Sequence, residues 1–169
     1  MIPLAPHPDH PPEAVRGMEV AVERQGRMLQ LLYGLRGRVE DMVIPEAAEA
    51  ERRDGLWQTS CFEAFLRKPG EEGYYEFNFS PSSAWAAYRF SGYRQGMEHA
   101  AVEPPRIETR KLGGTVELRV SLQLPGDGPW QLGLSAVVEE RGGRKSYWAL
   151  AHPAAKADFH APSSFIHEI

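Results

Sequence analysis

The sequence predicts an all-β protein, an antiparallel β-sandwich, and three observations support this fold class. Apolar and polar residues alternate strictly over residues 115–124, as expected of a strand with one buried face. Similar short alternating segments recur along the chain, separated by clusters of Pro, Gly and Ser. Only one short segment has helical character. About ten short strands spaced in this way are typical of two packed sheets.

The chain opens with a proline-rich segment, residues 1–15, which carries five Pro in its first twelve residues. Proline fixes φ and lacks an amide donor, so we expect an extended lead-in outside the central strands, with regular structure starting near Met18. Residues 16–169 are expected to form one β-sandwich domain, because a chain of this length supports a single core.

The expected strands follow from the alternation and lie at residues 18–24, 27–35, 39–44, 59–67, 74–80, 84–91, 106–111, 115–124, 132–138 and 146–150. Arg141-Gly-Gly-Arg144 supplies the residues of positive φ that a tight hairpin into the last strand needs. At most one or two short helices are expected. The best candidate is 45–53, with Pro in its first turn, Ala inside and Gly55 just beyond its end.

Charge and composition exclude several classes of protein. The chain has 19 Lys and Arg against 23 Asp and Glu, interspersed along its length, so the concentrated basic face of a nucleic-acid-binding protein is not expected. A run of about 18 apolar residues that could span a bilayer is missing, and the first residues lack the features of a secretory signal. A single cysteine, Cys61, cannot form an internal disulfide. We expect a cytoplasmic protein with no membrane partner.

The candidate functional residues lie on the strands expected at 59–67 and 74–80. Side chains alternate between the two faces of a strand, so Glu63 shares a face with Cys61 and Phe65 and lies opposite to Phe62, Ala64 and Leu66. In the second strand, Glu76 and Asn78 likewise part from the aromatic residues between them. If the two strands form a hairpin, both carboxylates and the amide share one solvated face, and the aromatic face is the core.

Carboxylates and amides beside aromatic rings suit sugars, whose hydroxyl groups need acceptors and donors while their C–H faces stack on rings. Trp57, just before the first of these strands, offers such a ring. A purely structural interpretation remains open, in which Glu63 and Glu76 are the solvated side of the sheet and Trp57 fills the core.

Three segments carry a family resemblance: Asp54-Gly-Leu-Trp-Gln-Thr-Ser-Cys-Phe-Glu-Ala-Phe-Leu66, Tyr75-Glu-Phe-Asn78 followed by Ser80-Pro81, and Asp158-Phe-His-Ala-Pro-Ser-Ser-Phe165. Together, and in this order, they resemble the DOMON-like, family-nine carbohydrate-binding modules from about Val20 to the end of the chain. The resemblance implies a β-sandwich without catalytic residues, in which the end of a sugar is held between two aromatic rings with polar groups around it.

Carried onto this sequence, the resemblance matches Trp57 to the first stacking tryptophan and Glu63 to a sugar-binding acid. Phe159 stands where a second tryptophan usually lies, and Glu76 stands where a basic residue is common, so both halves of the site depart from the family pattern. The prediction is a non-catalytic domain that binds a saccharide or polyol. Its predicted ligand-binding residues are Trp57, Glu63, Glu76, Asn78, Arg89 and Phe159.

Two enzymatic alternatives use residues of the same two strands. Glu63 and Glu76 could be the carboxyl pair of a glycoside hydrolase, but the pair also explains hydroxyl binding without any chemistry, so we do not expect an enzyme. Cys61 could be a nucleophile, yet no basic partner lies near it in the sequence.

No cofactor is expected. Asp158 and His160 are candidate metal ligands by residue type, although their spacing fits no known zinc site. The resemblance allows a calcium ion that braces a loop, as in related modules. Some DOMON domains hold haem between a Met and a Lys or His, for which Met42, Met97 and His99 are candidates, but methionine more commonly fills a core.

Overall fold

The computed structural model describes residues 1–169 and consists almost entirely of antiparallel strands. The strands are β1 (Ile2–Pro6), β2 (Val15–Gln25), β3 (Met28–Gly37), β4 (Cys61–Arg67), β5 (Tyr74–Phe79), β6 (Trp85–Phe90), β7 (Glu98–His99), β8 (Arg106–Leu112), β9 (Thr115–Gln123), β10 (Gln131–Glu139), β11 (Lys145–Ala149) and β12 (His167–Glu168). The helical structure is limited to three short 3-10 turns, η1 (Val39–Asp41), η2 (Leu56–Gln58) and η3 (Pro162–Ser164).

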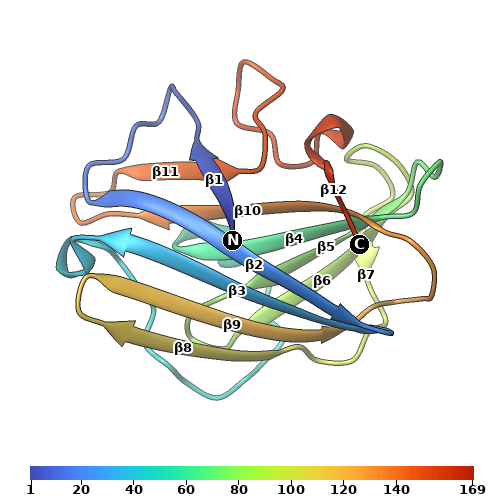
Figure 1. The fold of residues 1–169 in the computed structure, drawn as a ribbon, viewed down its shortest axis with the longest axis horizontal. Helices are drawn as coiled ribbons and strands as arrows, with labels where there is room; N and C mark the ends of the chain where they lie inside the picture. The colour runs from blue at the N-terminus through green and yellow to red at the C-terminus, as the bar shows by residue number, and fades with distance from the viewer.

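The strands form one continuous sheet that curls over itself into two layers (Figure 1). The strand order is β7-β6-β5-β4-β10-β11-β1-β2-β3-β9-β8, with β12 paired to β10. We call β2, β3, β9 and β8 the front layer, and β7, β6, β5, β4, β10 and β11 the rear layer. Strand β1 joins them, because Ile2–Leu4 pair with β2 and Ala5–Pro6 pair with β11. The predicted antiparallel β-sandwich is confirmed.

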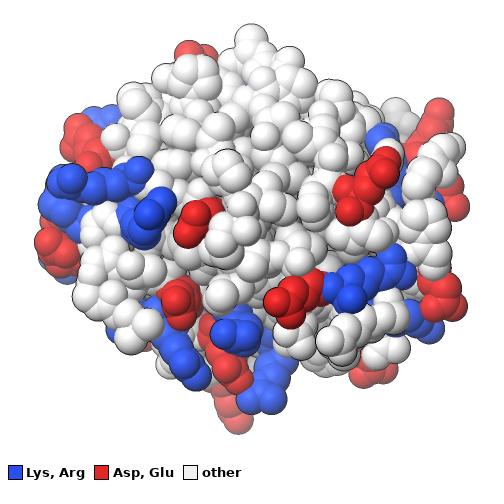
Figure 2. All heavy atoms as spheres, in the orientation of Figure 1, with Lys and Arg blue, Asp and Glu red and all other residues white.

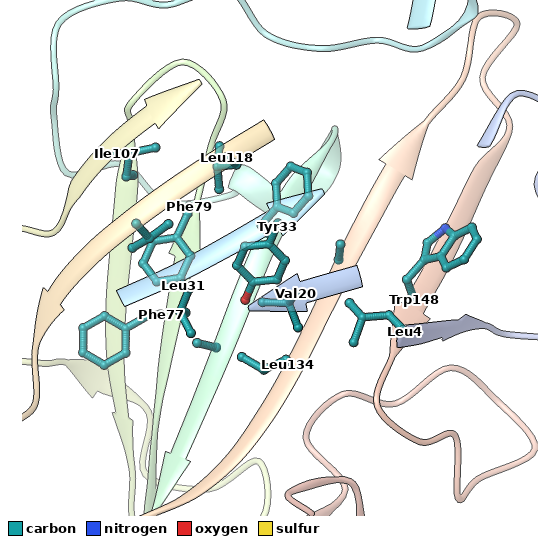
Figure 3. Close-up of a cluster of buried hydrophobic side chains, with 14 of the residues drawn as sticks. Leu4, Val20, Leu31, Tyr33, Phe77, Phe79, Ile107, Leu118, Leu134 and Trp148 are labelled. Atoms are coloured by element: carbon teal, nitrogen blue, oxygen red, sulfur yellow. The ribbon is translucent and has the colours of Figure 1, made fainter. Parts of the chain in front are cut away.

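The core lies between the two layers and follows the predicted alternation (Figure 3). Leu118 on β9 and Leu31 on β3 face Phe77 and Phe79 on β5, and all four are buried. Tyr33 of the front layer stacks at a tilt on Phe62 of the rear layer, with ring centroids 5.1 Å apart. Burial of these side chains is the main source of stability for a chain without disulfides.

The predicted hairpin from β10 to β11 is confirmed, and it turns at the predicted pair of glycines. Gly142 and Gly143 have φ values of 92° and 89°, which residues with a Cβ rarely adopt. This hairpin sets the register between β10 and β11, in which Ser135 is opposite Ala149 and Glu139 is opposite Lys145.

The proline-rich segment does not lie outside the sheets. The expectation that regular structure starts near Met18 is wrong, because β1 begins at Ile2 and β2 at Val15. Pro3 and Pro6 occupy β1 without a backbone donor, and the strand changes partner between them, so no long ladder on one side is interrupted.

The helix expected over 45–53 is also wrong. This segment runs beside the edge of β6, where Trp85 donates its backbone N–H to the carbonyl of Glu51 and Arg53 donates to the carbonyl of Trp85, both at 2.9 Å. The guanidinium of Arg52 lies 4.8 Å from the centre of the Trp85 ring. Pairing with the sheet therefore replaces the short helix, whose nine residues are too few to be stable alone.

The strand expected over 39–44 is replaced by η1 and a single bridge between Met42 and Glu140. The two-residue strands β7 and β12 were not predicted, since two residues carry no alternation that a sequence pattern could reveal.

The charged side chains are spread along the margins of the molecule. Figure 2 shows Lys and Arg interspersed with Asp and Glu around the lower part of the face seen in Figure 1, with few charges over β1 and β11. None of the three 3-10 turns approaches the length and apolar character of a membrane-spanning helix.

Candidate functional site

Strands β4 and β5 form the predicted hairpin, and their register brings the polar candidates together. Glu63 lies directly opposite Asn78, and Glu76 lies opposite Phe65. Glu63, Glu76 and Asn78 therefore emerge on the same face of the rear layer, turned away from the core between the layers. The predicted shared face is confirmed.

This face is buried, contrary to the prediction that it is solvated. Glu63 is 3% exposed, Glu76 is 7% exposed and Asn78 is 1% exposed. A second apolar cluster surrounds them on this face, and includes residues from η2 and from the segment after β11. Its members are Leu56, Cys61, Phe65, Tyr74, Ala84, Ala86, Tyr88, Phe90 and Phe165. The polar groups thus lie at the bottom of a covered site instead of on an open surface.

The covered site is a cavity of about 530 Å³, which is within the range of small-molecule sites. Its lining consists of Trp57, Glu63, Glu76, Asn78, Tyr88, Phe90, Arg94, Met97, Val137, Tyr147, Ala157, Phe159 and His160. Five of the six residues predicted to bind a ligand are among them, drawn from four separate segments of the chain.

The sixth, Arg89, lies on the other face of β6, so its predicted place in the site is wrong. Arg89 is opposite Tyr75 in the register, and its guanidinium lies 4.8 Å from the centre of the Tyr75 ring. It donates a hydrogen bond to the backbone carbonyl of Tyr74 at 3.1 Å and packs against Gly73, where a Cβ would clash with it. Arg89 therefore stabilises the pairing between β5 and β6.

Burial raises the proton affinity of both carboxyl groups on this face. Burial is the main cause that raises the pKa of Glu63 well above its ordinary value, and the neighbouring Glu76 raises it further. Burial raises the pKa of Glu76 to about 7, although Asn78 and Arg94 lower it in part. Ser135 donates a hydrogen bond of 3.4 Å to Glu63, which is a long contact for a carboxylate.

His160 faces Glu76 but does not act as its cationic partner. The two side chains are 3.4 Å apart, and the other ring nitrogen of His160 bonds the hydroxyl of Tyr74 at 2.8 Å. Burial lowers the pKa of His160 to about 4, with a further contribution from Arg94. At neutral pH this imidazole is therefore uncharged.

Arg94 is the only Lys or Arg side chain that lines the cavity, and it already has a partner. Its guanidinium donates to Asp158 at 2.9 Å, and Tyr93 donates to the same carboxylate. Because this ion pair offsets the charge of Arg94, both carboxyls of the cavity lack a cation of their own.

Asn78 carries an unmet hydrogen bond at the bottom of the cavity. Its side-chain oxygen is buried and accepts no hydrogen bond from the protein. It is the only buried side-chain nitrogen or oxygen without a hydrogen-bond partner. Buried polar atoms are normally satisfied, so such an exception calls for a functional explanation.

Aromatic rings form most of the remaining wall. Trp57, on η2, is 56% exposed, which excludes the interpretation that it fills the core. Phe159 is half-buried, and its ring centroid is 6.1 Å from that of Tyr147. Stacking surfaces of this kind suit the apolar faces of a ring-shaped ligand.

Three residues of the cavity, Tyr88, Phe90 and Tyr147, were not predicted, although strand alternation carried a signal for them. Glu76 is opposite Tyr88, so Tyr88 and Phe90 share its face, while Arg89 cannot. Tyr147 is placed in the same way by the β10–β11 hairpin. Identification of these residues needed the register between hairpins, which the alternation within one strand does not give.

The structure also places the candidates for other chemistry. Cys61 is fully buried, and burial raises the pKa of its thiol, which opposes a nucleophilic thiolate. No three His, Cys, Asp or Glu side chains gather closely enough to hold a metal ion, and Asp158 and His160 are engaged with protein groups. Met42 is in the core, and His99 pairs with Asp54 at 3.0 Å.

The fold is similar to those of solved carbohydrate-binding proteins. A proposed carbohydrate-binding protein from Bacteroides uniformis aligns with a TM-score of 0.72 and 16% identity, over 98% of this chain and 83% of that one. A family-nine carbohydrate-binding module from Caldicellulosiruptor kristjanssonii, solved with glucose, aligns with a TM-score of 0.54 and 12% identity, over 90% of this chain and 74% of that one. A structure of a family-nine module from the same organism in complex with cellotriose aligns with a TM-score of 0.55 and 13% identity, over 93% of this chain and 78% of that one.

No protein-family model and no curated protein matches the sequence. At these identities the similarity shows the fold, which is that of the family-nine modules, as the resemblance in the sequence implied.

Proposed function

We propose that the cavity binds a saccharide or a similar polyol and does not convert it chemically. The observation that carries this proposal is the unpaired oxygen of Asn78 beside the carboxyls of Glu63 and Glu76. These groups offer hydrogen-bond acceptors that the protein leaves largely unused, and sugar hydroxyls supply donors to match them.

The aromatic wall supports the same class of ligand. Trp57 and Phe159 would stack on the C–H faces of a sugar ring while its hydroxyls reach the polar groups below. The family-nine modules of similar fold were solved with glucose and with cellotriose, which agrees with this proposal.

Binding fits the geometry better than hydrolysis. A glycosidase needs one ionised carboxylate as base or nucleophile while the other carboxyl is protonated as the acid. Here burial raises the pKa of both Glu63 and Glu76, and Arg94, the one cation that lines the cavity, is already paired with Asp158.

Titration calorimetry with glucose and cello-oligosaccharides tests the proposal. Trp57→Ala should weaken binding at least about tenfold, because it removes the most exposed ring of the cavity. The matched control is Leu112→Ala, which removes an equally exposed apolar side chain from the far edge of the front layer and should leave affinity unchanged. Equal affinities in wild type and Trp57→Ala would place the ligand elsewhere.

A further inference from the structure

The charge of the cavity identifies a narrower class of ligand. The titratable side chains that face the cavity are Glu63, Glu76, Tyr88, Arg94, Tyr147 and His160. Two of them are acids, one is a base already paired to Asp158, and the imidazole is uncharged at neutral pH. The cavity therefore has an excess of acidic groups and no free cation.

Burial of two carboxyls without a cation is unfavourable for the protein alone. Each carboxyl loses its hydration, and Ser135 and His160 make only contacts of 3.4 Å with them. A ligand that brings a positive charge into the cavity would stabilise the ionised form of these carboxyls.

The groups around the two carboxyls can also accept the hydrogen bonds of an ammonium group and attract its charge. An ammonium has three donors and no acceptor, and the oxygens of Glu63, Glu76 and Asn78 are acceptors on one face. The faces of aromatic rings also attract cations, and Trp57, Tyr88, Phe90, Tyr147 and Phe159 line the same cavity.

We infer that the cavity selects an amino sugar, a saccharide whose cationic amine lies between Glu63 and Glu76 with its ring against the aromatic wall. This inference rests on the proposed function and narrows it from saccharides in general to those with an ammonium group. A neutral sugar would fill the same space but would leave both carboxyls in the protonated form that burial favours.

Calorimetry at about pH 7 with four ligands of similar size tests this inference. Glucosamine carries the amine, N-acetylglucosamine carries a neutral amide at the same position, glucose carries a hydroxyl, and glucuronate carries an anion. Glucosamine should bind at least about tenfold more tightly than N-acetylglucosamine or glucose, and glucuronate should bind least. Ethanolamine, an amine without the sugar ring, should bind much more weakly than glucosamine.

Variants of the two acids connect the preference to the carboxyls. In Glu76→Gln and in Glu63→Gln the ratio of glucose to glucosamine dissociation constants should fall several-fold towards one, because one of the two carboxyls that attract the amine is removed. Glu23→Gln, at an exposed position on β2, is the matched control and should keep the ratio. Thermal unfolding shows that each variant is folded.

Proton release provides a separate readout. Titrations in two buffers of different ionisation enthalpy should show a proton leaving the protein when glucosamine binds, because the ligand favours the ionised form of Glu76. The release should shrink in Glu76→Gln.

The outcomes separate this inference from the proposed function. Equal binding of glucose and glucosamine overturns the inference and leaves saccharide binding intact, as does a preference for glucuronate. A preference that survives both Gln variants, or equal affinity for ethanolamine, also overturns it. If no saccharide binds, both proposals are wrong.

Discussion

Asn78 combines deep burial with an acceptor that no protein group satisfies. An unsatisfied buried polar group typically destabilises a protein by about 1–3 kcal/mol, and removal of the group recovers part of that amount. We expect Asn78→Leu, which has a similar volume, to raise the free energy of unfolding by about 1 kcal/mol and to weaken saccharide binding at least about tenfold. Urea unfolding and calorimetry measure the two effects.

The opposite signs of the two effects are the informative part of this experiment. Ser135→Ala, on strand β10 next to β4, is a suitable comparison because it removes a hydroxyl that is bonded to the carboxyl of Glu63. If Asn78→Leu were less stable than wild type and had unchanged affinity, the Asn78 oxygen would have a structural partner in the protein and would not bind the ligand.

At the level of single residues, strand alternation predicted the candidate site well. Glu63, Glu76 and Asn78 were assigned to one face from period two alone, and they share that face. Their burial could not be predicted, because it depends on chain segments distant in sequence, such as the segment that carries Phe159. The assignment of Arg89 failed because Arg89 is opposite Tyr75 in the register and therefore lies on the other face of the sheet.

At the scale of secondary structure, one buried acid connects three elements. Glu140 follows β10 and accepts hydrogen bonds from the backbone N–H groups of Glu13, Ala14 and Val15, at 2.9 to 3.3 Å. These donors lead into β2, and Glu140 itself also bridges Met42. It therefore attaches the start of the front layer to the β10–β11 hairpin.

Replacement of Glu140 should be strongly destabilising. We expect Glu140→Ala to lower the free energy of unfolding by about 3 kcal/mol, because the buried backbone donors lose a charged acceptor. Glu140→Gln retains one acceptor oxygen and should lower it by less. Chemical denaturation measures these effects, with the exposed Glu23→Ala as control. Glu140 variants as stable as the control would contradict this role.

The elements that sequence reasoning missed share a physical cause. Long strands such as β9 carry their own alternation, and their existence was predicted correctly. Residues 45–53 carry a local helix signal, but pairing with the edge of β6 overrides it. Strand β1 is rich in proline, and its pairing with both β2 and β11 is visible only when the two layers are assembled.

For the molecule as a whole, the cavity makes stability depend on pH in two opposing ways. Glu76 has a pKa of about 7 in the folded state against an ordinary 4.5, so the folded protein binds its proton more tightly than the unfolded chain. The stabilisation that this provides is lost as the pH rises from about 4.5 to about 7. His160 has a pKa of about 4 against an ordinary 6.5, so its contribution grows over nearly the same interval.

Removal of one titrating group should therefore expose the trend of the other. Each shift corresponds to about 3 kcal/mol when integrated over its interval. Relative to wild type, the stability of Glu76→Gln should thus rise by up to about 3 kcal/mol between about pH 4.5 and pH 7.5, because the variant no longer loses the Glu76 contribution. His160→Gln should show the reverse trend, a relative loss of similar size, because it no longer gains from the release of the imidazole proton. Urea unfolding across this pH range measures both differences. If the three proteins gave parallel profiles, the carboxyl and the imidazole would have ordinary pKa values and the cavity would be open to water, which would also remove the electrostatic basis for selection of a cationic sugar.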